Sequence, residues 1–242
     1  SGETNETLSI LENYKNSEGK FIAFSSGGKM EDYSKKNNID FYKIKKEHSP
    51  RASFLGFLYS TLNVLEEIIP INESEVRESV RHLVQTKNKI DTHSLNAENE
   101  ALKLANWIKN IPIIYYPWGL QSAAIRFKNS MQENSKKHVL FEDVIEASHN
   151  GIVSWEKSSN IQPILMQGKD DHFKTRERWK IFKEFFTEKN IDYQEIFSVD
   201  SNILSKLVCL VYTLDMTSLY NAVIEKIDPT PVTSIDFIKS KL

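Results

Sequence analysis

The sequence predicts an α/β protein with two domains, each a doubly wound parallel sheet covered by helices on both faces. Segments with a strand pattern alternate with segments of helical periodicity along the chain, and such alternation requires crossover connections between parallel strands. Two strand segments, IPIIYYP and IQPILMQG, are almost continuously apolar, as expected for strands buried on both faces. A polar bridge, KNKIDTHSLNAENEA, interrupts the pattern around residues 88–98. We therefore expect domains at residues 1–97 and 98–242.

The first half is short for such a domain, because it opens on a helix and contains only two predicted strands. Leu8, Ile10 and Leu11 have helical spacing within residues 4–15, and the strand KFIAFSSGG follows, ending in a small-residue turn. MEDYSKKNN is predicted to be a short polar helix and IDFYKIKKE a strand. SPRASFLGFLYSTLNVLEEII has a serine cap, a proline in its first turn and a long apolar face, which predict a helix. NESEVRESVRHLVQTK is predicted to be a mostly solvated helix.

The second half repeats the alternation more completely. Its predicted helices are ALKLANWIKN, GLQSAAIRFKNSMQENSK, TRERWKIFKEFFTEKN and residues 203–226, and its predicted strands are IPIIYYP, HVLFEDV, IQPILMQG and DYQEIFSV. A tail, DPTPVTSIDFIKSKL, follows the last helix.

Composition and charge exclude several classes of protein. The formal net charge of −2 gives no electrostatic case for binding nucleic acid or an anionic membrane. The one cysteine, Cys209, lies in the apolar run LSKLVCLVYTL, so it reads as a buried thiol in a reducing compartment. No apolar run is expected to reach the length of a membrane span, and no signal segment opens the chain. We expect a cytoplasmic protein without membrane or nucleic-acid partners.

A metal centre and other cofactors are not expected either. No two of the six histidines have the spacing of a pair of metal ligands, and a single cysteine does not complete a ligand set. There is also no P-loop, because no Gly-Lys-Ser/Thr stands at the required offset.

The opening stretch SGETNETLS has the composition of an anion site. Gly2 permits close approach of the backbone, Ser1 and Thr4 offer hydroxyls, and the helix that follows presents its free N–H groups. The same residues also fit an ordinary helix cap, in which Ser or Thr is followed by Glu, and their spacing alone favours that interpretation. SSGGKMED, after the next strand, has the same ambiguity, although two such turns at the ends of strands favour a ligand site.

Three charged or titratable residues are candidates for chemistry elsewhere. Glu133 falls at the end of an apolar-faced helix, and His149 follows one strand and a turn later, so the two offer a general base and acid. Arg51, at the start of a helix, suits a phosphate or hydroxyl. The alternative is that all three are ordinary solvated residues, and the sequence pattern alone favours that alternative.

Several of these stretches, taken in order, resemble one family. SGETNETLSI is similar to the phosphate loop of sugar-isomerase (SIS) domains, and SSGG follows in the same layout. HSPRASF, KNSMQENSKK, SHNGIVSWE and DPTPVTSIDFIKSKL resemble the linking, second-domain and C-terminal motifs of the bifunctional phosphoglucose/phosphomannose isomerases. The resemblance covers essentially the whole chain. It implies two SIS domains with the site between them at the interface of a homodimer.

The resemblance also implies an activity and roles for individual residues. The activity is interconversion of glucose 6-phosphate or mannose 6-phosphate with fructose 6-phosphate, without metal. Glu133 would move the proton between C1 and C2, and His149 of the neighbouring subunit would assist ring opening. The remaining implied roles are phosphate binding by Ser1 and Thr4, enediolate stabilisation by Arg51, sugar contact by Lys239, and acceptance of both epimers by the segment around Thr230.

The chain departs from the family pattern at its start. Family members begin with a strand and helix unit and a second strand before the SIS loop, and Glu3 stands where asparagine is usual. We therefore expect a fragment or an internally started product. The leading hypothesis is an isomerase, and the alternative is a non-catalytic sugar-phosphate-binding protein or an inactive truncated isomerase. An aminosugar isomerase domain fits less well, because the tail matches the bifunctional family.

Overall fold

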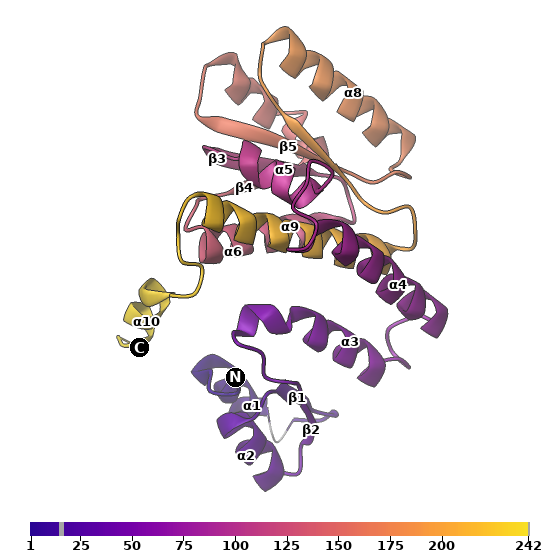
Figure 1. The fold of residues 1–242 in the computed structure, drawn as a ribbon. Coiled ribbons are helices and arrows are strands. Elements are labelled where there is room, and N and C mark those ends of the chain that lie inside the picture. Colours follow the sequence, from indigo (N-terminus) through magenta and orange to yellow (C-terminus); the bar gives the residue numbers. More distant parts are fainter. Residues whose placement is uncertain (15–16, 242) are drawn as a thin grey trace. The chain divides into compact units, whose positions relative to one another are not determined.

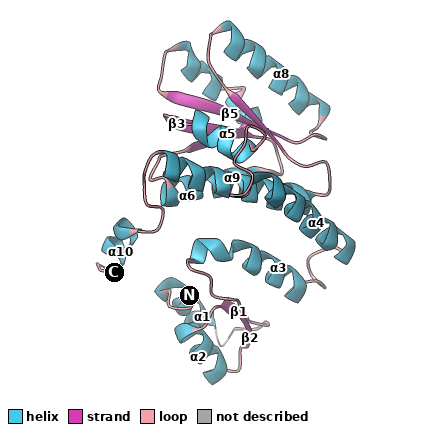
Figure 2. Cartoon of the chain, viewed as in Figure 1, coloured by secondary structure: helices cyan, strands magenta, loops and turns pink. Residues whose placement is uncertain are grey.

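A computed structural model describes residues 1–14 and 17–241, which form two compact units, Ser1–Asn72 (unit 1) and Glu73–Leu242 (unit 2). Lys15, at the end of the first predicted helix, and Leu242, at the end of the predicted second domain, lie outside the described residues. Both units are of the predicted α/β class and their strands pair in parallel (Figures 1 and 2).

Unit 1 is a small parallel pair of strands with helices packed on it. Its elements are α1 (Asn5–Tyr14), β1 (Ile22–Ser25), α2 (Gly28–Lys36), β2 (Asp40–Lys43), the 3-10 turn η1 (Pro50–Ser53) and α3 (Phe54–Val64). Leu11 of α1, Ala23 of β1 and Met30 of α2 form one buried cluster, so the apolar spacing that predicts α1 also explains its packing. The helix crossover between β1 and β2 makes these strands parallel.

The helix predicted from residue 49 differs from the structure in two respects. Its first turn is the 3-10 turn η1, and the α-helix begins only at Phe54 and ends at Val64. Ser49 makes no capping hydrogen bond through its side chain, and its buried hydroxyl has no partner among the described residues. Ser49 therefore takes the predicted N-cap position, with Pro50 in the first turn, but it caps a 3-10 turn through its backbone carbonyl and not through its side chain.

Unit 2 is a doubly wound sheet with strand order β4-β3-β5-β6, all parallel. Its helices and 3-10 turn are α4 (Glu73–Ile90), α5 (Glu100–Trp107), α6 (Gln121–Asn134), α7 (Val144–Ala147), η2 (Gly151–Glu156), α8 (Phe173–Glu188), α9 (Ile203–Ile224) and α10 (Thr233–Lys239). Its strands are β3 (Ile111–Tyr116), β4 (Leu140–Asp143), β5 (Ile161–Gln167) and β6 (Gln194–Phe197). The chain leaves β3 toward β4, crosses back to β5 and continues to β6, so helices cover both faces (Figure 1).

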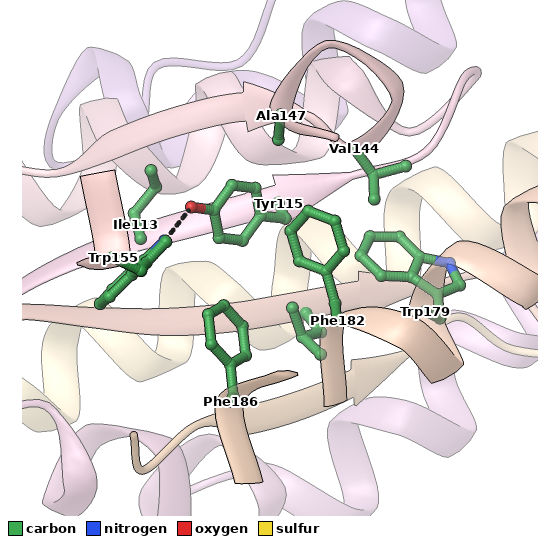
Figure 3. Packing of buried hydrophobic residues seen from close by; sticks show 9 residues of the cluster. Ile113, Tyr115, Val144, Ala147, Trp155, Trp179, Phe182 and Phe186 are labelled. Carbon is green, nitrogen blue, oxygen red and sulfur yellow. Dashed lines mark hydrogen bonds between the residues drawn. The ribbon is translucent and has the colours of Figure 1, made fainter. Parts of the chain in front are cut away.

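One face of the sheet is closed by an aromatic core. Tyr115 of β3 lies between Trp155 of η2 and Phe182 of α8 (Figure 3). Leu165 of β5 and Trp179 of α8 belong to the same buried cluster. The Trp155 indole N–H donates a hydrogen bond to the Tyr115 hydroxyl at 2.9 Å. The almost continuous apolar pattern of β3 and β5 is confirmed as that of strands buried on both faces.

The opposite face is organised around α9, on which α4, α5 and α6 pack. Ile90, at the end of α4, shares a buried cluster with Ala101, Ala105 and Tyr220, and the Tyr220 hydroxyl donates to the Ile90 carbonyl at 2.7 Å. The compact units therefore divide before α4, whereas the sequence predicts a division between residues 97 and 98. The polar bridge after α4 marks a turn, and long-range packing on α9 assigns α4 to unit 2.

The same helix corrects one expectation about membranes. Among the residues that the structure describes, α9 is the one helix long and apolar enough to cross a bilayer, although no apolar run of that length was expected. In its most apolar window, 61% of the residues are buried inside the unit, and buried core helices commonly pass the same test.

Candidate active site

In unit 1, two glycine-containing loops lie against each other. A Cβ atom added to Gly2, whose φ is +82°, would lie 1.9 Å from the carbonyl oxygen of Gly27, so only glycine fits there. The Met30 amide donates to the Gly2 carbonyl at 3.0 Å, and the buried Ser25 hydroxyl donates to the Gly27 carbonyl at 2.8 Å. The sequence motifs SGET and SSGG thus form one packed structure.

Ser1 and Thr4 both lie at the exposed start of α1, as expected for groups that would bind an anion. The Ser1 hydroxyl accepts a weak hydrogen bond from the Glu3 amide at 3.4 Å, and the Leu8 amide donates to the Thr4 carbonyl at 3.1 Å. Among the described residues, the Thr4 hydroxyl makes no hydrogen bond. These hydroxyls and the free N–H groups of the first turn of α1 can receive a phosphate.

Glu3 has a contact that its sequence position did not suggest. Its carboxylate accepts the backbone N–H of Lys29, in the first turn of α2, at 3.1 Å, and lies 3.8 Å from the Lys29 ammonium. The Glu3 carboxylate therefore occupies the positive end of α2 and ties the two loops together.

Arg51 lies in the turn η1, half-buried, immediately before α3. This is the helix-start position that the sequence predicts for it.

In unit 2, Glu133 lies in the last turn of α6, at the edge of a cavity of about 610 Å³. The tail forms the other side of this cavity, from Pro231 to Ile235. The size lies within the about 300–1,000 Å³ typical of small-molecule sites. The cavity therefore brings the Glu133 carboxylate together with the C-terminal segment.

The sequence-predicted residues of the tail lie beside this cavity rather than in its lining. Thr230 directly precedes the lining residue Pro231, and its backbone N–H donates to Asp228 at 2.8 Å. This amide and the Thr230 hydroxyl lower the pKa of Asp228. Lys239 lies exposed in the last turn of α10, outside the cavity lining.

Glu133 is the one sequence-predicted site residue in this lining, and Lys136 and His138 are among the others. His138 was considered only as a metal ligand, for which it has no partner spacing. Lys136 belongs to the QENSK motif, but nothing in its own position signals that its side chain reaches the tail.

A buried polar network holds the last turn of α6 in place. The Arg126 guanidinium forms a bidentate ion pair with Asp215 of α9, at 3.0 and 2.8 Å, and the Ser130 hydroxyl donates to the same carboxylate. The Asn134 amide donates to the Ser218 hydroxyl at 2.8 Å, and the Ser135 hydroxyl donates to the Ser218 carbonyl at 2.8 Å. From Arg126 to its end, α6 is thus bonded to α9.

The chain does not bring His149 to Glu133. Because α6 connects the carboxyl end of β3 to the amino end of the parallel strand β4, Glu133 lies toward the amino ends of the strands. His149 follows β4 and α7 and so lies toward their carboxyl ends. Within one chain, therefore, the two residues belong to opposite ends of the sheet.

The surroundings of His149 are acidic. Its amide donates to the Glu146 carbonyl at 2.9 Å, and Glu142 lies so close to Gly151 that an added Cβ atom would be 2.4 Å from its carboxylate. Burial, and then the negative charges of Glu146 and Asp143, raise the pKa of Glu142.

No group of three or more His, Cys, Asp or Glu side chains within residues 1–14 and 17–241 is arranged to hold a metal ion. Cys209 is buried in α9, and burial raises the pKa of its thiol. It is therefore a protonated core residue at neutral pH.

Comparisons with known proteins identify the same family that the sequence motifs resemble. Residues 97–242 match the model of the bacterial phospho-glucose isomerase C-terminal SIS domain. The whole chain is 31% identical to a bifunctional phosphoglucose/phosphomannose isomerase from Caldicellulosiruptor bescii and 28% identical to one from Aquifex aeolicus, covering 74% and 73% of those proteins.

The fold is also that of solved SIS-type proteins. A tagatose-6-phosphate ketose/aldose isomerase from Escherichia coli superposes with a TM-score of 0.73 at 14% identity, over 95% of this chain and 68% of that chain. Together with the predicted motifs QENSK, SHNGIVSWE and DPTPV, these matches show that the chain belongs to the family of bifunctional phosphoglucose/phosphomannose isomerases.

Proposed function

We propose that this chain is an aldose–ketose isomerase that interconverts glucose 6-phosphate or mannose 6-phosphate with fructose 6-phosphate through a cis-enediol. The observation that carries the proposal is Glu133, a carboxylate at the edge of a cavity of ligand size, in a chain of this family. A protein that only binds a sugar phosphate needs an anion site, but it does not need a base.

A single base suffices for both aldose phosphates. Glu133 removes the proton from C2 of the open-chain aldose while O1 gains a proton, which gives the enediol; O2 then loses its proton and Glu133 returns the first proton to C1, which gives the ketose. The reverse sequence regenerates the aldose. Glucose and mannose phosphates differ only at C2, and that carbon is planar in the enediol. One carboxylate therefore serves both epimers if the cavity accepts either hydroxyl orientation.

The other predicted residues take roles that suit their chemistry. Ser1 and Thr4 bind the phosphate with the first turn of α1, and the Arg51 guanidinium stabilises the enediolate oxygens. Lys239 contacts the sugar, and Thr230 belongs to the segment that accepts both epimers. His149 assists ring opening.

We further infer that the enzyme is a metal-independent homodimer that acts in the cytoplasm, in glycolysis and gluconeogenesis, without nucleic-acid or membrane partners. A homodimer accounts for His149, because a second chain is needed to supply it to a Glu133 at the opposite end of the sheet. Turnover unchanged by a chelator, and a molecular mass of two chains in solution, are the expected results.

The experiment is a coupled assay with Glu133→Gln and a matched control, Glu184→Gln. Glu184 is an exposed glutamate of α8 with no ion pair among the described residues. Glu133→Gln should lose at least roughly a hundredfold of both aldose activities, because a general base contributes that much or more. The control should retain wild-type turnover.

Wild-type turnover in Glu133→Gln would refute the assignment of the base. Binding of fructose 6-phosphate to the wild-type chain without formation of either aldose phosphate would identify a sugar-phosphate-binding protein instead.

A further inference from the structure

One side chain joins the turn that carries Glu133 to the C-terminal tail. The Lys136 ammonium donates hydrogen bonds to the backbone carbonyl of Glu133 at 2.5 Å and to the backbone carbonyl of Pro231 at 2.7 Å. Residues 136 and 231 are 95 positions apart, so this is a tertiary contact and not a local helix-end interaction. Hydrogen bonds from a charged donor are stronger than neutral ones.

The backbone of Lys136 is in a conformation that usually favours another residue. Its φ is +55°, in the left-handed region where glycine or asparagine commonly ends a helix. Lysine at such a position accepts a conformational cost that glycine would avoid. At Lys136 the two hydrogen bonds described above work against that cost.

Lys226 provides an internal comparison. It is also a lysine with a left-handed backbone, φ +59°, directly after the end of α9, and it is exposed. Among the described residues its ammonium has no hydrogen bond or ion pair. The two positions share residue type, backbone and exposure, and differ in the contacts of the side chain.

The tail is not buried in unit 2. No residue of α10 is buried, and residues 228–235 are exposed or half-buried. Yet Pro231 to Ile235 form one side of the cavity whose other side carries Glu133. The link from Lys136 ties that side directly to the turn that carries Glu133.

We propose that Lys136 is a positioning residue that fixes the tail over Glu133 and so shapes the pocket in which the sugar is held. The expected effect on kinetics rests on the proposed function, whereas the expected effect on the position of the tail does not. A tail that is released leaves the sugar free to lie in several orientations beside the base. Both the affinity for substrate and the rate of proton transfer then fall.

The experiment uses the full chain with Lys136→Met, Lys136→Gly and Lys136→Arg, and Lys226→Met as the matched control. Hydrogen exchange of residues 229–241 reports the tail directly. Steady-state kinetics with fructose 6-phosphate report the site. Lys136→Gly is the decisive variant, because glycine relieves the left-handed backbone while the link is removed.

For Lys136→Met and Lys136→Gly we expect tail amides to exchange at least about tenfold faster, and kcat/KM to fall by a similar factor with KM raised. Lys136→Gly should nevertheless unfold at the same temperature as wild type or higher. Lys136→Arg should retain most of the protection of the tail amides against hydrogen exchange. Lys226→Met should change neither the exchange of the tail nor the kinetics.

Unchanged tail exchange in both Lys136→Met and Lys136→Gly would overturn the inference, whatever the enzyme does. Faster tail exchange with unchanged kinetics would refute the positioning role while leaving the link in place. Loss of thermal stability in Lys136→Gly that matches the loss of activity would assign Lys136 a merely structural role. The assignment of Glu133 is tested separately by Glu133→Gln, so failure of either proposal is recognisable.

Discussion

The Asn134 amide donates a buried hydrogen bond to the Ser218 hydroxyl at 2.8 Å, which couples the residue after Glu133 to the centre of α9. The Ser218 hydroxyl in turn donates to the Asp215 carbonyl at 2.6 Å. The position of the proposed base is therefore set by a helix that begins some seventy residues after it, since α9 starts at Ile203.

Ser218→Ala should weaken this coupling. It leaves the buried Asn134 amide without its acceptor, which costs about 1–3 kcal/mol of unfolding free energy. Urea unfolding measures the loss, and kcat should fall more than KM changes. Ser154→Ala is the control, because the Ser154 hydroxyl bonds only the nearby Gly151 carbonyl on an exposed turn. Equal stability of the two variants would contradict the role of the network.

Tyr115→Phe tests the aromatic core. The substitution removes the acceptor of the Trp155 indole N–H and should cost about 1–3 kcal/mol, with the fold retained. Burial raises the pKa of Tyr115 to about 12, so its phenol should stay protonated while exposed tyrosines ionise near 10. An alkaline absorbance titration should therefore lose its latest step in the variant. A titration curve identical to that of wild type would show that Tyr115 is not the buried phenol.

Gly2→Ala tests the packing of the two loops of unit 1. The added methyl group would overlap the Gly27 carbonyl, so hydrogen exchange in β1 and β2 should accelerate. Gly19→Ala is matched in backbone, since Gly19 also has a positive φ, of +133°, but nothing lies within 4 Å of its added Cβ atom. Both variants carry a conformational cost of about 1–2 kcal/mol, and only Gly2→Ala carries the overlap in addition. Equal exchange in the two variants would mean that the loops do not touch.

Glu142→Gln tests the acidic surroundings of His149 through the dependence of stability on pH. The pKa of Glu142 is raised in the folded state, so the folded state binds this proton more tightly than the unfolded chain does. Its contribution to stability is then fully present below the unfolded pKa of about 4.3 and is lost as pH rises through the folded pKa.

The glutamine variant has no such loss. Its unfolding temperature relative to wild type should be higher at pH 7 than at pH 4, whereas Glu184→Gln should show no such trend. The opposite trend for Glu142→Gln would mean that a stabilising partner, and not burial, dominates at Glu142.

Mixed dimers test the origin of His149. Glu133→Gln and His149→Ala should each be inactive alone. If each site takes Glu133 from one chain and His149 from the other, an equimolar mixture of reassociated subunits should recover about a quarter of wild-type activity, because half of the dimers are mixed and each has one intact site. No recovery in a mixture shown to contain the mixed dimer would rule out a shared site.

The sequence predicts most of the fold of unit 2 because each of its elements has a local signature. The continuous apolar runs of β3 and β5 and the periodicity of α6, α8 and α9 are visible within a single window. What the sequence does not predict is packing between distant segments. The assignment of α4 to unit 2 depends on α9, and the short helix α7 and turn η2 depend on burial of Trp155 against Tyr115.

In the candidate site, too, some residues can be identified from the sequence and others cannot. Glu133 is selected through the resemblance of its QENSK motif to the family, because its position at a helix end alone favours an ordinary solvated residue. The structure places it at a cavity, and its role as the base stays a prediction. Lys136 is missed because its partners are two backbone carbonyls, one of them in the tail, and a carbonyl has no sequence signature. The roles of Ser1, Thr4, Arg51, Lys239, Thr230 and His149 remain predictions.

The packing of α4 on α9 has a consequence for synthesis of the chain. Ile90 emerges from the ribosome 130 residues before Tyr220. In the folded protein, the Ile90 carbonyl accepts a hydrogen bond from the Tyr220 hydroxyl. Until α9 is made, the apolar face of α4 lacks its main packing partner. Contacts of such high sequence separation slow folding and expose apolar surface to aggregation. A nascent chain of this protein should therefore expose the apolar face of α4 until α9 is complete, however early its sheet begins to form.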